Sequence, residues 1–200
     1  MDRTETVEII IEKAGKLFRR FGPMKTPVRI IARELNMSPA NVYKHFPTKH
    51  VLIEAVMERQ LETVKTSIIQ SCVANTGHFE RIRCLAYKVM DYFETTIEGE
   101  SDYLHIEMVS DVIRFEISGP RNSWEFIKNF HQFLRGKILE YIKDGVACGE
   151  MRVEDPEDAA GAVLDSLNRI IEPILLLEDP KPVRVERLER LLRLIQRALA

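Results

Sequence analysis

The sequence predicts an all-α protein with a small three-helix N-terminal domain and a larger helical domain after it. Nine Gly and nine Pro in 200 residues are few helix breakers, and the prolines fall mostly at the edges of segments. Leu, Ile, Glu, Lys and Arg, which favour helices, are abundant. Apolar residues recur at steps of three and four, as they do on one face of a helix.

The composition, 45% hydrophobic and 30% charged, is that of a folded globular protein with a sizeable core. No apolar run approaches the roughly 18 to 20 residues of a membrane span, so no membrane contact is expected. The N-terminus mixes acidic and basic residues and does not resemble a signal peptide. Three widely spaced cysteines, Cys72, Cys84 and Cys148, favour reduced thiols in the cytoplasm.

The charge is distributed unevenly between the two predicted domains. Residues 1–50 carry 10 Lys and Arg against 5 Asp and Glu, a net charge of +5. The remaining residues carry 19 basic against 26 acidic side chains, a net charge of −7. A basic N-terminal part on an acidic body indicates that the N-terminal part meets a polyanion.

The first two helices of the small domain have clear ends. An apolar stripe over 7–21 predicts an amphipathic helix, which Gly22-Pro23 ends. Thr26 is expected to cap a second helix over 27–35, with Pro27 at its first position. Asn36 follows that helix, at a place where a left-handed residue is usual and Asn is the next choice after Gly.

Two more helices follow the turn at 36–38. Ser38-Pro39 repeats the cap and opens a short helix over 39–46, and Pro47-Thr48 caps a fourth helix from Lys49 to about Cys72. Ala32 is small where the two short helices touch, Asn36 lies at the turn, and Val42 locks the second helix onto the first. This spacing is typical of a helix-turn-helix.

With these residues the chain resembles the TetR family of bacterial transcriptional regulators. The resemblance covers roughly residues 7–60 and rests on Thr26, Ile31-Ala32, Met37-Ser38, Val42-Tyr43, His45-Phe46, Lys49 and Leu52. Asn36 replaces the usual turn Gly and Ala40 takes a place often held by Gly, and neither departure is expected to disturb the motif. The resemblance implies a DNA-binding domain over 1–48 and a helical ligand-binding and dimerisation domain over 49–200.

Without the motif spacing, the polar residues of the N-terminal domain (the head) would indicate only two capped helices exposed to solvent. With it, hydroxyls and helix N-terminal amides suit phosphate oxygens. The resemblance implies backbone contacts for Tyr43, His45 and Lys49, while Asn41, Lys44 and Arg29 can reach base edges. The predicted DNA-contacting residues are Thr26, Arg29, Ser38, Pro39, Ala40, Asn41, Tyr43, Lys44, His45, Thr48 and Lys49.

Helices are expected further along over about 78–98, 102–117 and 121–147, from Pro156, and over 185–199. Aromatic and Met side chains on the middle helices are most often plain core, but a regulator of this family should hold a cavity there. The predicted ligand-binding residues are Phe93, Tyr103, Met108, Trp124, Phe130 and His131.

The last two helices carry two apolar stripes, one of them at 3-4-3-4 spacing like a coiled-coil seam. Packing within one chain would explain them, but the family resemblance favours a four-helix dimer interface. The predicted interface residues are Ala160, Val163, Leu164, Leu167, Ile171, Leu188, Leu192 and Ile195.

We therefore predict a ligand-responsive repressor that binds a near-palindromic operator as a homodimer and is released by a small apolar or aromatic effector. Its partners would be double-stranded DNA, the effector and a second copy of the chain. No catalytic motif, cofactor or metal site is expected: His45 and His50 are five residues apart, and no Cys pair has zinc spacing. The alternatives are an activator of the same fold, or a helical ligand-binding protein or enzyme that retains the head as a scaffold.

Overall fold

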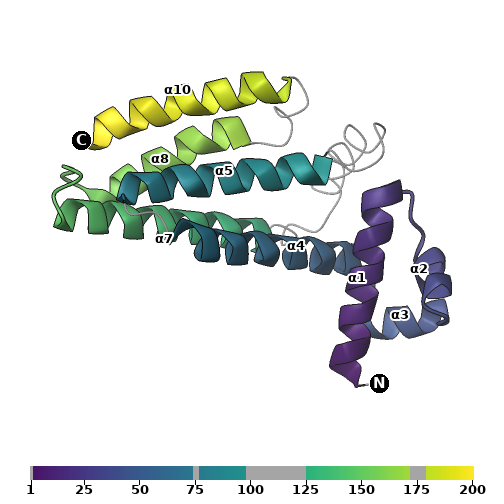
Figure 1. The fold of residues 1–200 in the computed structure, drawn as a ribbon. Helices are drawn as coiled ribbons and strands as arrows, with labels where there is room; N and C mark the ends of the chain where they lie inside the picture. Colours follow the sequence, from purple (N-terminus) through teal and green to yellow (C-terminus); the bar gives the residue numbers. More distant parts are fainter. Residues whose placement is uncertain (1, 74–76, 98–124, 172–178) are drawn as a thin grey trace. The chain divides into compact units, whose positions relative to one another are not determined.

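The computed structural model describes residues 2–73, 77–97, 125–171 and 179–200. Within these ranges the chain forms eight α-helices and no strand (Figure 1), which confirms the predicted all-α fold. The helices are α1 (Arg3–Phe21), α2 (Val28–Glu34), α3 (Pro39–His45), α4 (Lys49–Cys72), α5 (His78–Ile97), α7 (Glu125–Ala147), α8 (Pro156–Ile171) and α10 (Lys181–Leu199). The helix expected over 102–117 lies outside the described residues.

Two helices begin earlier than the apolar pattern indicated. The Asp2 carboxylate accepts a hydrogen bond from the Arg3 amide and caps α1, which begins at Arg3, four residues before the first apolar position at Val7. Pro180 and Pro182 surround the start of α10, which therefore begins at Lys181 rather than at 185. No helix of the described part of the chain is both long enough and apolar enough to cross a membrane.

The chain divides into two compact units. Unit 1 comprises Met1–Glu62 with Thr96–Phe126, and unit 2 comprises Thr63–Thr95 with Ile127–Ala200. The sequence placed the first boundary at residue 48. The compact unit extends further because Leu52, Ile53 and Val56, in the first half of α4, are buried in the same core as α1, α2 and α3.

Unit 1 is held together by apolar side chains from four helices. Its core residues are at most 5% exposed and consist of Ile10, Ala14, Phe18, Val28, Ile31, Ala32, Val42, Phe46, Leu52, Ile53 and Val56. The short helix α2 packs against both α1 and α3. Because α2 and α3 have seven residues each, this packing, rather than their own hydrogen bonds, keeps them helical.

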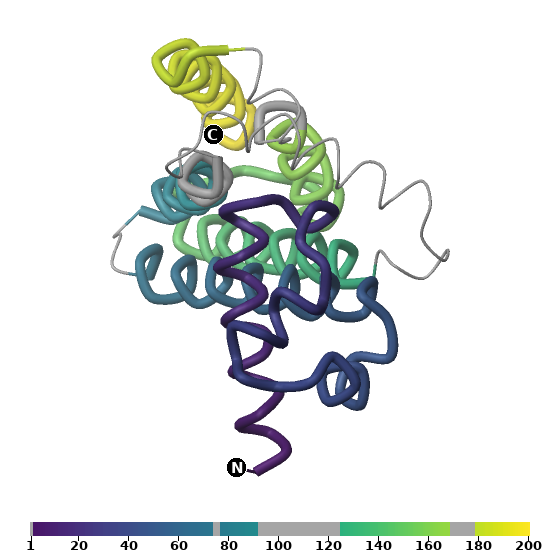
Figure 2. Tube along the Cα trace, turned by 90° about the vertical axis from the view of Figure 1, so that its right-hand side faces the viewer, coloured from purple at the N-terminus to yellow at the C-terminus, as the bar shows by residue number. Residues whose placement is uncertain are grey.

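Unit 2 is a bundle of helices that run in alternating directions along the chain (Figure 1). Figures 1 and 2 both show α8 and α10 side by side, and these two helices pack against each other. The largest fully buried side chains of the unit are Ile68, Ile82, Leu85, Met90, Leu134, Ile138, Tyr141, Ile142 and Leu167.

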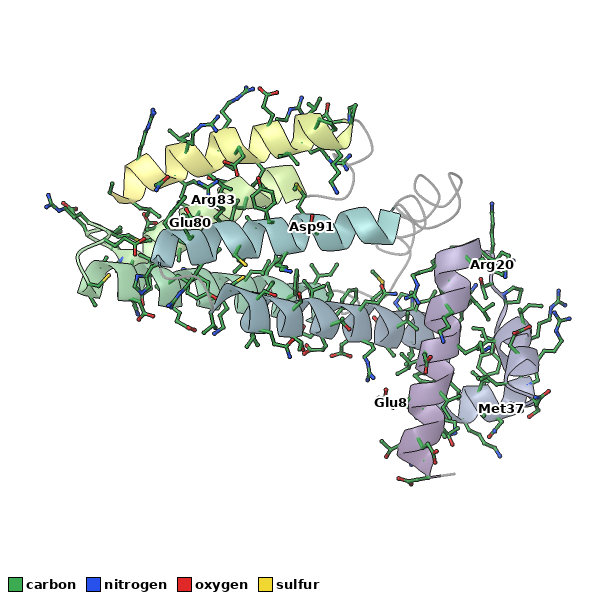
Figure 3. All side chains as sticks on the ribbon, in the orientation of Figure 1. Glu8, Arg20, Met37, Glu80, Arg83 and Asp91 are labelled. Carbon is green, nitrogen blue, oxygen red and sulfur yellow. The ribbon has the colours of Figure 1, made fainter. Side chains whose placement is uncertain are left out.

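A polar network joins α5 to α10. Nη1 of Arg83 lies 2.6 Å from each carboxylate oxygen of Glu189, and the Tyr87 hydroxyl donates to Oε1 of Glu189 at 2.6 Å. Figure 3 shows Arg83 and Glu80 in the first half of α5, with α10 alongside. The hydrogen bond from Arg83, then that from Tyr87, outweighs burial and lowers the pKa of Glu189 below its usual value.

Replacing Glu189 by Gln should therefore destabilise the protein in a pH-dependent way. A depressed carboxyl pKa contributes stability above the usual value near 4.5 and loses it as the pH falls through the folded-state pKa. We expect Glu189→Gln to lower the free energy of unfolding by about 1–2 kcal/mol near neutral pH, because charge-assisted hydrogen bonds are lost. Urea unfolding at about pH 7 and about pH 3.5 measures this. A difference that does not shrink in acid would contradict it.

Candidate nucleic-acid interface

The chain reverses direction between α2 and α3 at Asn36. Asn36 has a φ of 52° and is the one non-glycine residue with a positive φ among those described. Its amide donates to the Arg33 carbonyl at 3.1 Å, and the Met37 amide donates to the Ala32 carbonyl at 2.9 Å. These two bonds form a left-handed C-cap that satisfies the last carbonyls of α2. The left-handed turn predicted at Asn36 is confirmed.

The helix after this turn has a capped start and a buried side. Oγ of Ser38 accepts a hydrogen bond from the Asn41 amide at 3.2 Å, and Pro39 occupies the first helical position, as the sequence predicted. Val42 is fully buried and Phe46 is 5% exposed, so these two residues anchor α3 in unit 1. The rest of the circumference of α3 is left for polar side chains.

The outward face of α3 and its flanks holds most of the predicted contact residues. Arg29, Ser38, Pro39, Ala40, Tyr43, Lys44 and Thr48 are exposed, whereas Asn41, His45 and Lys49 are half-buried. Oγ1 of Thr48 accepts from the Val51 amide at 3.2 Å and starts α4. Nδ1 of His45 is buried, and no atom in the described part of the chain forms a hydrogen bond with it. The backbone of the motif thus brings these side chains onto one segment of unit 1.

Thr26 behaves differently from the sequence-based expectation. It is 2% exposed, and its hydroxyl donates to the Gly22 carbonyl at 2.8 Å. The N-cap of α2 is Pro27, which has no side-chain acceptor, so the predicted capping role of Thr26 is wrong. Gly22, with a φ of 81°, ends α1 and leaves its carbonyl to be satisfied by Thr26. A buried hydroxyl in this bond has almost no surface for a phosphate.

Lys49 has a structural contact that the sequence did not indicate. Its ammonium nitrogen lies 3.0 Å from the carbonyl oxygen of Met24, in the loop between α1 and α2. This hydrogen bond ties the first turn of α4 to that loop. No sequence signal marks it, because the two residues are far apart along the chain and the acceptor is a backbone atom.

The predicted ligand-binding residues are only partly covered by the structure. Tyr103, Met108 and Trp124 lie outside the described residues, and the side chain of Phe93 is not described. Phe130 is 4% exposed and belongs to the core of unit 2, whereas His131, the next residue of α7, is exposed. Successive helical residues point about 100° apart, so an apolar neighbour in sequence does not make His131 a core residue.

The predicted interface residues on α8 and α10 are buried within a single chain. Those described are at most 6% exposed: Ala160, Val163, Leu164, Leu167, Leu188, Leu192 and Ile195. The side chain of Ile171 is not described. These seven side chains pack α8 and α10 into unit 2, which is the alternative the apolar stripes left open. They leave little surface for a partner subunit, so any interface on these helices must use their other faces.

Comparisons with known proteins agree with this architecture. Residues 10–56 match the family model described as bacterial regulatory proteins, tetR family, and residues 117–192 match that of the tetracyclin repressor-like C-terminal domain. The chain is 22% identical over 157 residues to the uncharacterized HTH-type transcriptional regulator YhgD of Bacillus subtilis (strain 168), covering 78% of each chain.

Two solved structures show the same fold. A TetR transcription regulator from Haloarcula marismortui ATCC 43049 has a TM-score of 0.74 at 19% identity, with 98% of both chains covered. FadR from Bacillus subtilis, in complex with stearoyl-CoA, has a TM-score of 0.67 at 14% identity, covering 96% of this chain and 99% of FadR. The chain belongs to the TetR family of bacterial transcriptional regulators, which are DNA-binding transcription factors and not enzymes.

Substitutions at Asn36 should test how much the left-handed turn contributes to stability. Asn36→Gly removes the strain of the Cβ atom, so it should leave stability unchanged or raise it slightly. Asn36→Val places a β-branched residue at the same φ and should cost about 1–2 kcal/mol. Urea unfolding of the two variants measures the difference. Equal stability of the Val and Gly variants would show that the turn does not constrain the motif.

Proposed function

We propose that this regulator is a repressor that binds a near-palindromic operator as a homodimer and is released by a small apolar or aromatic effector. The main support for this DNA-binding surface is that α3 has one buried apolar side and one exposed polar side. Val42 and Phe46 fix one side of the helix in the core, while Tyr43 and Lys44 are exposed on the other. A short, rigidly anchored helix with an outward polar row is what insertion into a major groove requires.

The charge of the N-terminal residues supports the same proposal. The net charge of +5 over residues 1–50 favours approach to phosphates, and this contribution falls as salt rises. Arg29 and Lys44 are exposed basic side chains of the motif itself. We assign base contacts to Asn41, Lys44 and Arg29, and backbone contacts to Ser38, Tyr43 and Thr48. Pro39 and Ala40, which are exposed at the start of α3, allow close approach to the DNA.

Selection of bound sites from random duplex DNA, followed by two substitutions, tests this assignment. We expect a near-palindromic site, because a two-fold dimer presents two equal heads. Asn41→Ala should relax the preference at one base position in each half-site and cost roughly 1–3 kcal/mol on the best site. Tyr43→Phe should weaken binding to all duplexes by a similar factor. Affinities are compared at one fixed salt concentration.

Asn129→Ala provides a matched control, because Asn129 is an exposed Asn on α7 in unit 2. It should bind the selected site like the parent. If Asn41→Ala and Tyr43→Phe also bind like the parent, the outward face of α3 is not the DNA-reading surface. A reporter gene whose promoter contains the selected site tests the sign of regulation: its expression should fall when the protein is present, and a rise would identify an activator.

We place the dimer contact on the outward faces of α8 and α10. On α10, Leu194 is 64% exposed and Val183 is 37% exposed, and both lie on the side away from the buried seam. On α8, the small residues Ala159, Ala162 and Ser166 occupy the corresponding outward face. An exposed Leu on α10 and small residues on α8, two helices that pack against each other, permit close helix packing between two identical subunits.

Leu194→Glu should convert the dimer into a monomer without unfolding the chain. The new carboxylate would lie in an apolar contact if the dimer formed, which costs several kcal/mol, but it stays in water in the monomer. Sedimentation velocity at micromolar concentration measures the assembly state. Gln196→Glu, at an exposed site on another side of α10, is the control and should remain dimeric. A monomeric parent would refute the dimer, and a dimeric Leu194→Glu would refute this face.

The effector is assigned to unit 2, where Phe130 contributes to an apolar core. The FadR structure contains stearoyl-CoA, which supports a ligand with a large apolar part for a protein of this fold. The Tyr141 hydroxyl supplies a polar group that the sequence did not single out. It is buried and has no hydrogen-bond partner among the described residues, and burial and then the nearby Cys72 thiol raise the pKa of Tyr141 to about 12. It therefore stays protonated and can donate to an effector.

Tyr141→Phe should separate stability from effector response. Removing a buried hydroxyl without a partner should leave the free energy of unfolding unchanged or raise it by about 1 kcal/mol. Effectors found by thermal shift should release operator DNA less readily from Tyr141→Phe than from the parent. By linkage, the DNA-bound protein should bind the same effector more weakly. A loss of stability together with a full effector response would show that the hydroxyl has a structural partner instead.

A further inference from the structure

Three side chains with different metal-binding chemistry converge in unit 2. His78 begins α5, and Cys148 and Glu150 lie in the segment that connects α7 to α8. Nδ1 of His78 is 3.5 Å from Sγ of Cys148 and 2.8 Å from Oε2 of Glu150, and one donor atom from each residue lies within 4.8 Å of the others. We call these three residues the His78 trio.

The backbone determines where the trio lies. Gly149 has a φ of 80°, and the Glu150 amide donates to the Gly145 carbonyl at 2.8 Å. The Gly149 amide donates to the Val146 carbonyl at 3.1 Å. This left-handed C-cap of α7 turns the chain between Cys148 and Glu150, so that both side chains face His78. A side chain at residue 149 would strain this turn.

The first turn of α5 holds the Glu150 carboxylate in place. Oε1 accepts from the Phe79 amide at 2.9 Å, and Oε2 accepts from the His78 amide at 2.8 Å. Each carboxylate oxygen has a second lone pair, so Oε2 can keep its amide and also bind a cation. Backbone donors that orient a ligating carboxylate are the kind of outer contact that metal sites use. Capping of α5 alone would explain Glu150. The Cys148 thiol also donates to the Gly145 carbonyl at 3.4 Å, but neither contact requires the thiol to lie beside Nδ1 of His78.

The separation of the sulfur and nitrogen donors matches tetrahedral coordination of a zinc ion. Zn–S and Zn–N distances of about 2.3 and 2.0–2.1 Å place the sulfur and nitrogen ligands about 3.6 Å apart. The observed separation of Sγ and Nδ1 is 3.5 Å. The carboxylate oxygen, now hydrogen-bonded to the ring, would move away from Nδ1 by about 0.6 Å to reach a tetrahedral N–O separation. A thiolate and a carboxylate together balance the charge of a divalent ion.

We propose that the His78 trio is a binding site for one Zn²⁺ ion, with Nδ1 of His78, Sγ of Cys148 and a carboxylate oxygen of Glu150 as ligands. A mixed N, S and O set suits zinc better than the hard cations Mg²⁺ and Ca²⁺, which take oxygen ligands. Cys148 and Glu150 are exposed, so the ion can enter from solvent and the fourth position is open to water. Bound zinc would join the start of α5 to the end of α7. The site is independent of the assigned DNA-binding and dimer surfaces.

Metal titration of the full chain, reduced and freed of metal by a chelator, tests the proposal. With Co²⁺ as a probe, we expect thiolate-to-cobalt charge-transfer absorption that saturates at one equivalent and disappears when Zn²⁺ is added. Cys148→Ser should abolish this absorption. Cys84→Ser, at a half-buried thiol of the same unit, should retain it. Absence of the band in the parent, or its persistence in Cys148→Ser, would overturn the proposal.

Thermal unfolding with and without Zn²⁺ gives a second readout, one that does not depend on the thiol. A free Zn²⁺ concentration 100-fold above Kd should raise the Tm of the parent by roughly 5–10 °C. His78→Asn should weaken zinc binding at least about 100-fold and remove the shift, since even outer-shell losses cost 10–100-fold. Asn can still start a helix, so the fold of α5 is retained. His131→Asn, at an exposed His of α7, should keep the full shift. A zinc-dependent shift that survives in His78→Asn would overturn the assignment.

Discussion

The left-handed turn at Asn36 is the constraint on which the proposed recognition surface depends. Two seven-residue helices are too short to persist alone, so each must be held by contacts with the rest of unit 1. The turn gives α3 the direction that places Val42 and Phe46 in the core formed with Ile31 and Ala32. Because these apolar contacts bury one side of α3, the opposite, polar side is exposed to solvent. The surface that we propose to face DNA is therefore a consequence of burial on the opposite side of α3.

The same backbone device recurs at the end of α7, with a different consequence. Gly149 takes the left-handed conformation there, and Met151, two residues on, is 3% exposed. Met151 packs so tightly on α7 that a Cβ atom on Gly145 would lie 2.8 Å from its sulfur. Asn36 similarly precedes Met37, which packs against the core of unit 1. In both places a left-handed residue precedes a Met that packs on the core, fully buried at Met151 and partly buried at Met37, and polar residues near the turn lie at the surface.

The apolar sides of α8 and α10 are buried within unit 2 itself and are not left for a second subunit. Residues such as Leu188 and Leu192 have the spacing of an intersubunit seam, yet they are fully buried within one chain. Periodicity reports that a helix has one apolar side, but it does not say which partner covers that side. The family forms dimers, and the dimer surface that we propose carries Leu194 and small residues of α8 rather than the seam. This outward surface is less apolar, so the apolar periodicity of the sequence did not predict it.

The sequence by itself determined the helical class, the helix ends marked by Ser38-Pro39 and Thr48, and the reversal at Asn36, because these depend on contacts between residues at most five apart. It also determined which side of α3 is polar, through the spacing of Val42 and Phe46. Only the tertiary structure decided that Thr26 is buried against Gly22, that Leu52 belongs to unit 1, and that Lys49 reaches Met24. It alone brought His78 to Cys148 and Glu150 across some 70 residues. The physical reason is that burial and side-chain convergence depend on which helix faces pack together, and local propensity and periodicity carry no information about that choice.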